Sequence, residues 1–253
     1  MLPFLFSPQR RPIADPAQEF LRLMMTRTSL ASGVHACRVG EAWVFLHTLQ
    51  DRYFVLAGRQ ALWFSQIAQD GAPPALCAQA AALENRLCER GLLARQLHPG
   101  NVIAPAIETR NLAQLPAERG APVRLRDAAL FAFMFLTLCH LREPKRRNLP
   151  RILASVRRWK AAARARRGVR NKDAPSLTRS FRTLTPWFFS AHDACFFRSL
   201  LLVRFLCQYG IDPDWTFGVR VSPFRAHCWV SCDGYLLNED LDVTAGYQPI
   251  LTV

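Results

Sequence analysis

The stretch SAHDACFFRSLLLVRFLCQYG at residues 190–210 decides how the rest of the chain is interpreted. Apolar side chains continue for about three turns after Cys195, and Gly210 is a typical helix stop, so the pattern predicts a helix. Ser190 or Asp193 is the expected N-cap, which places Cys195 near the first turn. Unpaired N–H groups and the helix dipole favour a thiolate there. Cys195 is therefore the candidate nucleophile, and its N–H is a candidate oxyanion donor.

A candidate catalytic base follows 32 residues later. The sequence RAHCWVSCDGYLLNED at 225–240 predicts two strands joined by a two-residue Asp-Gly turn of type I′. Counting outward from the turn puts His227 opposite Asp240, so Asp240 is expected to orient the imidazole toward the sulfur. Glu239 takes this place if a bulge shifts the register by one residue, and Asp242 is a third candidate.

The remaining cysteines favour structural roles. Buried free cysteines usually behave as small apolar side chains, and we interpret in this way the ones inside helical apolar patterns, namely Cys77, Cys88, Cys139 and Cys207. Strand alternation places His227 on the opposite face from Cys228 and Cys232, so no metal site is predicted.

The C-terminal motifs resemble those of a known family. They are, in order, CFFRSLLL (195–202), AHCWV (226–230), DG (233–234), NEDLDV (238–243) and YQPI (247–250). From about Leu177 to Val253 the chain resembles the transglutaminase-like cysteine peptidase of lasso-peptide biosynthesis, the B protein that removes the leader from a ribosomally made precursor. In that family an aspartate usually follows the hairpin asparagine directly, and this chain has Glu239 there. The resemblance thus favours Glu239 as third catalytic member, whereas hairpin geometry favours Asp240.

The N-terminal third predicts a separate module. Short apolar or alternating runs at 34–38, 42–49 and 52–57, punctuated by glycines, predict a three-stranded meander. Helices are expected at about 60–70 and 75–90. Three strands followed by helices in this length predict a winged-helix-like module.

This module resembles the precursor-recognition element of peptide-modifying enzymes. The resemblance implies that a leader peptide adds as a strand to the third strand and packs on the last helix. The residues it assigns to leader binding are Tyr53, Phe54, Val55, Leu56, Leu83, Arg86, Leu87 and Arg90. Core packing is the alternative role of the apolar members of this set.

We therefore predict an α+β chain in which a winged-helix-like module precedes a transglutaminase/papain-like cysteine peptidase domain. The expected divisions are an N-terminal extension at 1–32, the recognition module at 33–105, a connector at 106–125 and the peptidase domain at 126–253.

Charge and hydropathy limit the partners and the cellular location that the sequence allows. The formal net charge is +14, and residues 142–172 contain thirteen basic side chains against one acidic one. A solvated helix face accounts for this run; an acidic partner, an anionic membrane surface or nucleic acid would account for it too. Nucleic-acid binding is disfavoured because the basic run lies outside the helix expected at 75–90. No secretory signal is evident, the longest apolar run at 128–136 is too short to span a bilayer, and the cysteine usage fits the cytoplasm.

The resemblance implies a reaction and a partner. Cys195 would attack the carbonyl at the leader–core junction, with His227 as base and then acid, and with the Cys195 N–H or an indole of Trp187 or Trp229 holding the oxyanion. An ATP-dependent, asparagine-synthetase-like lasso cyclase would then close the macrolactam, so ATP is needed only through this partner and no cofactor is expected in the chain. The alternatives are acyl transfer to an amine, as in a transglutaminase, and a non-catalytic leader-binding or DNA-binding scaffold.

Overall fold

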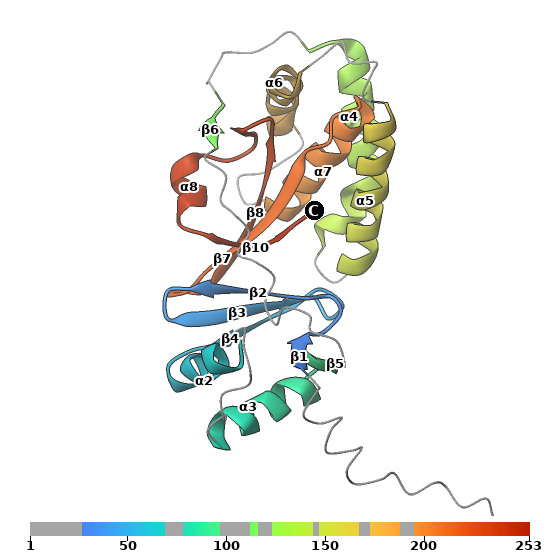
Figure 1. Ribbon diagram of the computed structural model, residues 1–253. Helices are drawn as coiled ribbons and strands as arrows, with labels where there is room; N and C mark the ends of the chain where they lie inside the picture. Colours follow the sequence, from blue (N-terminus) through green and yellow to red (C-terminus); the bar gives the residue numbers. More distant parts are fainter. Residues whose placement is uncertain are drawn as a thin grey trace, which may run out of the picture.

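The computed structural model describes residues 27–68, 78–96, 112–115, 123–143, 147–166, 173–187 and 195–253. These residues form a mixed α+β protein with an N-terminal module and a larger C-terminal domain (Figure 1). The described helices include none long and apolar enough to cross a membrane.

The N-terminal module is built on an antiparallel meander. Its elements are β1 (Arg27–Leu30), β2 (Val34–Val39), β3 (Ala42–His47), β4 (Arg52–Leu56), α2 (Arg59–Ile67), α3 (Ala78–Glu89) and β5 (Leu93–Gln96). Strands β2, β3 and β4 pair in chain order, which confirms the predicted meander. Strand β1 pairs with β5 and lies inside the segment that was expected to be an extension. The module thus begins earlier than predicted, and its winged-helix character remains a prediction.

The two faces of the sheet of β2, β3 and β4 pack on different cores, and its central strand β3 is buried on both. On one face Trp43 and Phe45 pack with α2 and α3 around the ring of Phe64. On the other face Val44 and Leu46 belong to the core of the C-terminal domain. All six residues of β3 are buried as a result. In Figure 1 the sheet accordingly lies between α2 and the strands of the C-terminal domain.

The C-terminal domain packs helices on one sheet. Its elements are β6 (Ala113–Gln114), α4 (Leu125–Leu138), η1 (Cys139–Arg142), α5 (Leu149–Ala165), α6 (Ala174–Leu184), η3 (Thr185–Trp187), α7 (Cys195–Gln208), β7 (Asp214–Arg220), β8 (Arg225–Cys232), β9 (Tyr235–Leu236), α8 (Leu241–Ala245) and β10 (Gln248–Thr252). The strand order is β10-β7-β8-β9-β6, and only the β6–β9 pair is parallel within the described ladders. Strand β6 lies in the predicted connector, so this segment contributes to the sheet.

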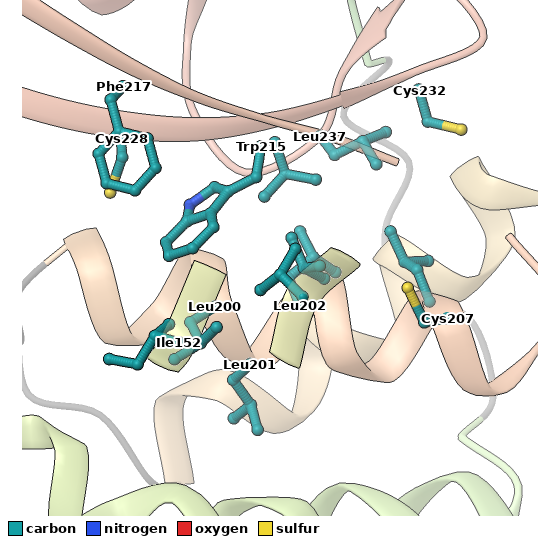
Figure 2. Close-up of a cluster of buried hydrophobic side chains, with 14 of the residues drawn as sticks. Ile152, Leu200, Leu201, Leu202, Cys207, Trp215, Phe217, Cys228, Cys232 and Leu237 are labelled. Atoms are coloured by element: carbon teal, nitrogen blue, oxygen red, sulfur yellow. The ribbon is translucent and has the colours of Figure 1, made fainter. Parts of the chain in front are cut away.

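Helix α7 is the centre of this domain. Helices α4, α5 and α6 pack against one side of it, and β7 and β8 against the other. Such a helix must be mainly apolar around its circumference, and its leucines and phenylalanines provide this, with Arg198 and Arg204 as the charged exceptions. Figure 2 shows Trp215 and Leu237 on the sheet side of this core, with Leu200 and Leu201 on the helix side.

The basic run is partly structural. Lys160 on α5 is buried, donates to the carbonyl of Val253 at 2.7 Å, and lies 3.5 Å from carboxylate oxygens of both Asp212 and Asp214. The described arginines of α5 are exposed, as expected for a solvated helix face; they are Arg151, Arg157, Arg158 and Arg164.

Candidate active site

Cys195 is the first residue of α7. The N-cap candidates Ser190 and Asp193 lie outside the described residues. The first N–H groups of a helix have no partner within it, and among the described residues no acceptor is found for the Cys195 N–H, so this N–H is a candidate oxyanion donor. The start of α7 faces β8, which carries the histidine.

His227 is positioned by the predicted hairpin. Strands β8 and β9 are joined by Asp233 and Gly234, whose φ angles of 51° and 83° confirm a turn with two left-handed residues. Opposite His227 on β7 lies Gly218. A Cβ at Gly218 would lie 2.5 Å from the Trp229 indole, so the missing side chain makes room for the ring next to His227. The Tyr247 ring, with its centroid 5.3 Å from that of the imidazole, flanks His227 as well.

Glu239, and not Asp240, is the carboxylate beside His227. The Glu239 Oε1 lies 3.5 Å from His227 Nε2. The expectation for Asp240 is wrong because the β8–β9 ladder ends at Leu236, and the Asn238 side chain then accepts from the Val230 N–H at 2.7 Å in place of a backbone partner. Counting outward along the ladder therefore fails beyond this point.

Asp240 and Asp242 have other surroundings. Asp240 is exposed, is the N-cap residue of α8 and accepts from Gln114 Nε2 at 3.1 Å. Asp242 is exposed in the first turn of the same helix. Neither forms a described ion pair with His227.

Arg198 supports Glu239 from the other side. It lies one turn after Cys195 on α7, and its Nη2 donates to Glu239 Oε1. The same carboxylate oxygen therefore contacts both cations, Arg198 and His227. Burial opposes ionisation of Glu239, but the hydrogen bond with His227 and the charge of Arg198 hold its pKa below the usual value. A charged Glu239 can then orient His227.

The electrostatics favour a thiolate–imidazolium pair. A hydrogen bond from the Cys228 side chain, and then the hydrogen bond and charge of His227, lower the pKa of Cys195 to about 4 although burial opposes this. For His227 burial opposes protonation, but the bonds to Cys195 and Glu239 raise its pKa to about 9. Because Nε2 faces Glu239, Nδ1 is left for the sulfur. The nucleophile is thus deprotonated at neutral pH without an external base.

Cys228 is a site residue that sequence reasoning missed. Its sulfur lies 3.2 Å from Ser199 Oγ, and both its thiol and its backbone N–H bond to the Cys195 sulfur. Cys228 lies opposite Phe217 on β7 and belongs to the domain core, whereas the neighbouring His227 packs on Tyr247. Both residues interact with Cys195, since His227 and Cys228 each lower the pKa of its thiol.

The N-terminal module contributes to the same site. The Tyr53 ring of β4 packs on Phe224 in the β7–β8 turn, with centroids 5.6 Å apart. Burial, and then the charges of Cys228, Asp51 and Cys195, raise the pKa of Tyr53. Arg147 stacks on the Phe196 ring at 4.5 Å, and its charge interacts with Asp51 and Cys195. The start of β4 therefore lies near the nucleophile.

The predicted leader-binding residues separate into exposed and buried groups. Val55, Arg86 and Arg90 are exposed, and Tyr53 and Phe54 are half-buried. The side chains of Leu56, Leu83 and Leu87 instead pack in the module's core, because β4 and α3 close on α2 and β3 there. These three leucines correspond to the core-packing alternative.

The proposed oxyanion donors differ in placement. Trp187 is 83 % exposed, whereas the buried Trp229 ring lies next to His227, 6.4 Å between centroids. The indole of Trp229 is therefore the better placed of the two. No cluster of His, Cys, Asp and Glu among the described residues could hold a metal ion.

Comparison with known proteins agrees with this geometry. A family model of the transglutaminase-like superfamily matches residues 135–252. This part of the chain is a transglutaminase-like domain. Cys195, His227 and Glu239 all lie within it, and the superfamily match indicates a fold of the cysteine peptidase or acyltransferase type. Searches of curated proteins and of solved structures found no match.

Proposed function

We propose that this protein is a leader peptidase of lasso-peptide biosynthesis. In this proposal the N-terminal module binds the leader of a ribosomally made precursor, and the transglutaminase-like domain hydrolyses the leader–core bond. The observation that carries it is the thiolate–imidazolium pair of Cys195 and His227, supported by Glu239. Such a pair suits acyl chemistry on a peptide.

The position of β4 supports a role in substrate delivery. In the described sheet, β4 pairs with β3 on one side only, so its other edge can accept an extended peptide. Tyr53, at the start of β4, lies near Cys195 and Phe224. A leader added to this edge would hold the following residues close to the nucleophile.

The reaction follows from the charges of the site. The Cys195 thiolate attacks the scissile carbonyl, and the Cys195 N–H stabilises the oxyanion. The His227 imidazolium then gives its proton to the leaving amine, which becomes the N-terminus of the core. Water, activated by the now neutral His227, hydrolyses the thioester and releases the leader. The free amine is the group that an ATP-dependent cyclase would join to a side-chain carboxylate.

Mass spectrometry of the precursor tests the chemistry. The precursor is incubated with the protein, with and without the neighbouring cyclase and ATP, using wild type, Cys195→Ala and Cys207→Ala. We expect one cut that Cys195→Ala abolishes and Cys207→Ala preserves. A product in which the acyl group is joined to an added amine would instead indicate transferase activity. Intact precursor in all samples, despite binding, would favour the scaffold alternative.

Leader binding tests the role of β4 separately. Val55→Pro removes a backbone N–H and constrains the edge strand, whereas Val55→Thr keeps the N–H and the branched side chain. Affinity is measured by fluorescence anisotropy of a labelled leader, after circular dichroism has shown that both variants are folded. We expect binding to be lost only in Val55→Pro. Equal affinity of the two folded variants would place the leader elsewhere.

A further inference from the structure

The second thiol of the site, Cys228, has no step in the reaction above. Ser199 lies one turn after Cys195 on the same face of α7, and its Oγ is 3.2 Å from the Cys228 sulfur. Interaction with Cys195 also adds to the burial that raises the pKa of Cys228. Cys228 therefore lies against the first turns of α7, across the α7–β8 contact from Cys195.

The two thiols differ in access to solvent. Cys228 is 2 % exposed, while Cys195 is only half-buried. Cys228 is held in place by a buried network in which Trp215 Nε1 donates to Ser199 Oγ at 2.9 Å and Ser199 Oγ donates to the Phe196 carbonyl at 3.0 Å. Figure 2 shows Cys228 next to Phe217 on the sheet side of the core. A small reagent from solvent can therefore react with Cys195, whereas Cys228 is shielded from it in the core.

We propose that Cys195 and Cys228 form an oxidation site, in which a hydroperoxide converts the two thiols into a reversible disulfide. The arrangement has the two parts that a thiol oxidation site requires, an accessible thiolate and an adjacent resolving thiol. The disulfide would occupy the nucleophile and switch the acyl chemistry off. It would also protect Cys195 from irreversible oxidation.

The chemistry balances with hydrogen peroxide as the oxidant. The Cys195 thiolate attacks one peroxide oxygen, the O–O bond breaks, and sulfenic acid and hydroxide form. The Cys228 sulfur then attacks the Cys195 sulfur, and the sulfenic oxygen leaves as water with the Cys228 proton. The hydroxide takes the proton of the His227 imidazolium, so each disulfide consumes one peroxide and releases two water molecules in total. A dithiol reductant reverses the oxidation by exchange.

Cys37 is the alternative partner that an experiment must exclude. It lies on β2, in the face that packs on the C-terminal domain, and Tyr53 experiences its charge together with those of Cys195 and Cys228. Burial raises the pKa of Cys37 to about 12 and also raises the pKa of Cys228, so acidity does not distinguish the two thiols and their placement relative to Cys195 decides which one resolves a sulfenic acid. No contact of Cys37 with α7 comparable to that of Ser199 and Cys228 is described.

The test uses the full-length protein and needs no precursor peptide. Wild type, Cys228→Ser and Cys37→Ser are treated with hydrogen peroxide, blocked with N-ethylmaleimide, digested without reductant and mapped by mass spectrometry. In parallel, the reactivity of Cys195 toward iodoacetamide is measured before oxidation, after it, and after dithiothreitol. Peroxide should abolish this reactivity in all three proteins.

The expected results separate the three proteins. Wild type and Cys37→Ser should yield a peptide pair linked through Cys195 and Cys228, and dithiothreitol should restore full reactivity. Cys228→Ser should yield sulfinic or sulfonic acid at Cys195 and recover no reactivity. The proposal fails if wild-type Cys195 is over-oxidised while Cys228 remains a free thiol, or if Cys195 is linked to Cys37. The readout is thiol chemistry, so it stands apart from the outcome of the peptidase assay.

Discussion

The two ends of helix α7 each carry a cysteine, and their chemistry is opposite. At the start, the bonds from Cys228 and His227 lower the pKa of Cys195 to about 4. Near the end, burial and then the charge of Asp212 raise the pKa of Cys207 to about 12. The residue type and the helix are the same, so the surroundings alone decide which thiol is a nucleophile.

The difference between the two pKa values depends on which groups can stabilise each thiolate. Cys195 has two side-chain donors and a backbone N–H, from residues of β8. Cys207 lies in the apolar core, 3 % exposed, and the cations Lys160 and Arg204 offset its burial only in part. Hydrogen bonds to the thiolate thus outweigh both burial and more distant charges at this helix.

Removing the imidazole of His227 should produce the largest change in the pKa of Cys195. His227→Ala takes away a donor and a positive charge, so the pKa of Cys195 should rise toward the ordinary value of 9.0. Alkylation of Cys195 by iodoacetamide at pH 6 should then fall by about 100-fold, because the thiolate is protonated as the pH falls below the new pKa. Stopped alkylation reactions analysed by mass spectrometry measure the rate at each pH. A wild-type inflection near 9 would contradict the ion pair itself.

Removing the charge of Glu239 should affect the pKa of His227, the other member of the thiolate–imidazolium pair. Glu239→Gln removes the negative charge next to the imidazolium, so the pKa of His227 should fall from about 9 by about one unit. Asp240→Asn is the matched control, and it should leave His227 unchanged because Asp240 faces Gln114. Histidine C–H resonances in NMR titrations report the shift. An equal shift in both variants would reopen the choice between the two carboxylates.

That choice shows where sequence reasoning reached its limit. The helix start at Cys195, the turn at residues 233–234 and the meander of β2 to β4 follow from local signals and were predictable. The identity of the carboxylate was not, because the ladder stops at Leu236 and a side chain, Asn238, replaces its next partner. Ladder counting assumes a continuous register, which the chain does not keep beyond Leu236.

The shared sheet left a signal in the sequence. The run AWVFL at 42–46 is apolar at every position, whereas a strand with one exposed face should alternate. A continuous run predicts burial on both faces, and the structure places one face on the module's helices and the other on the C-terminal domain. For Cys228 there was no comparable signal in the sequence. Strand alternation predicts the face on which a side chain lies, but not that a residue of another element, here Cys195, interacts with it.

Removing the Cys228 thiol should have an intermediate effect on the pKa of Cys195. Cys228→Ala removes the S–H donor but leaves the backbone N–H, so the inflection of Cys195 alkylation should move up by about one pH unit. The change is smaller than for His227→Ala because a positive charge remains beside the sulfur. The same alkylation profile measures it. An unmoved inflection in the folded variant would show that the imidazolium alone sets the acidity.

Cys207→Ala should have the smallest effect on reactivity and a measurable one on stability. The buried thiol fills space between α7 and the helix layer, and its removal should lower the free energy of unfolding by about 1 kcal/mol. Cys195 alkylation should keep its wild-type profile, since Cys207 is absent from the groups that set the Cys195 pKa. Urea unfolding and the alkylation assay together test both expectations. A shifted profile would mean that packing at one end of α7 controls the position of the nucleophile at the other, because no direct charge interaction joins the two thiols.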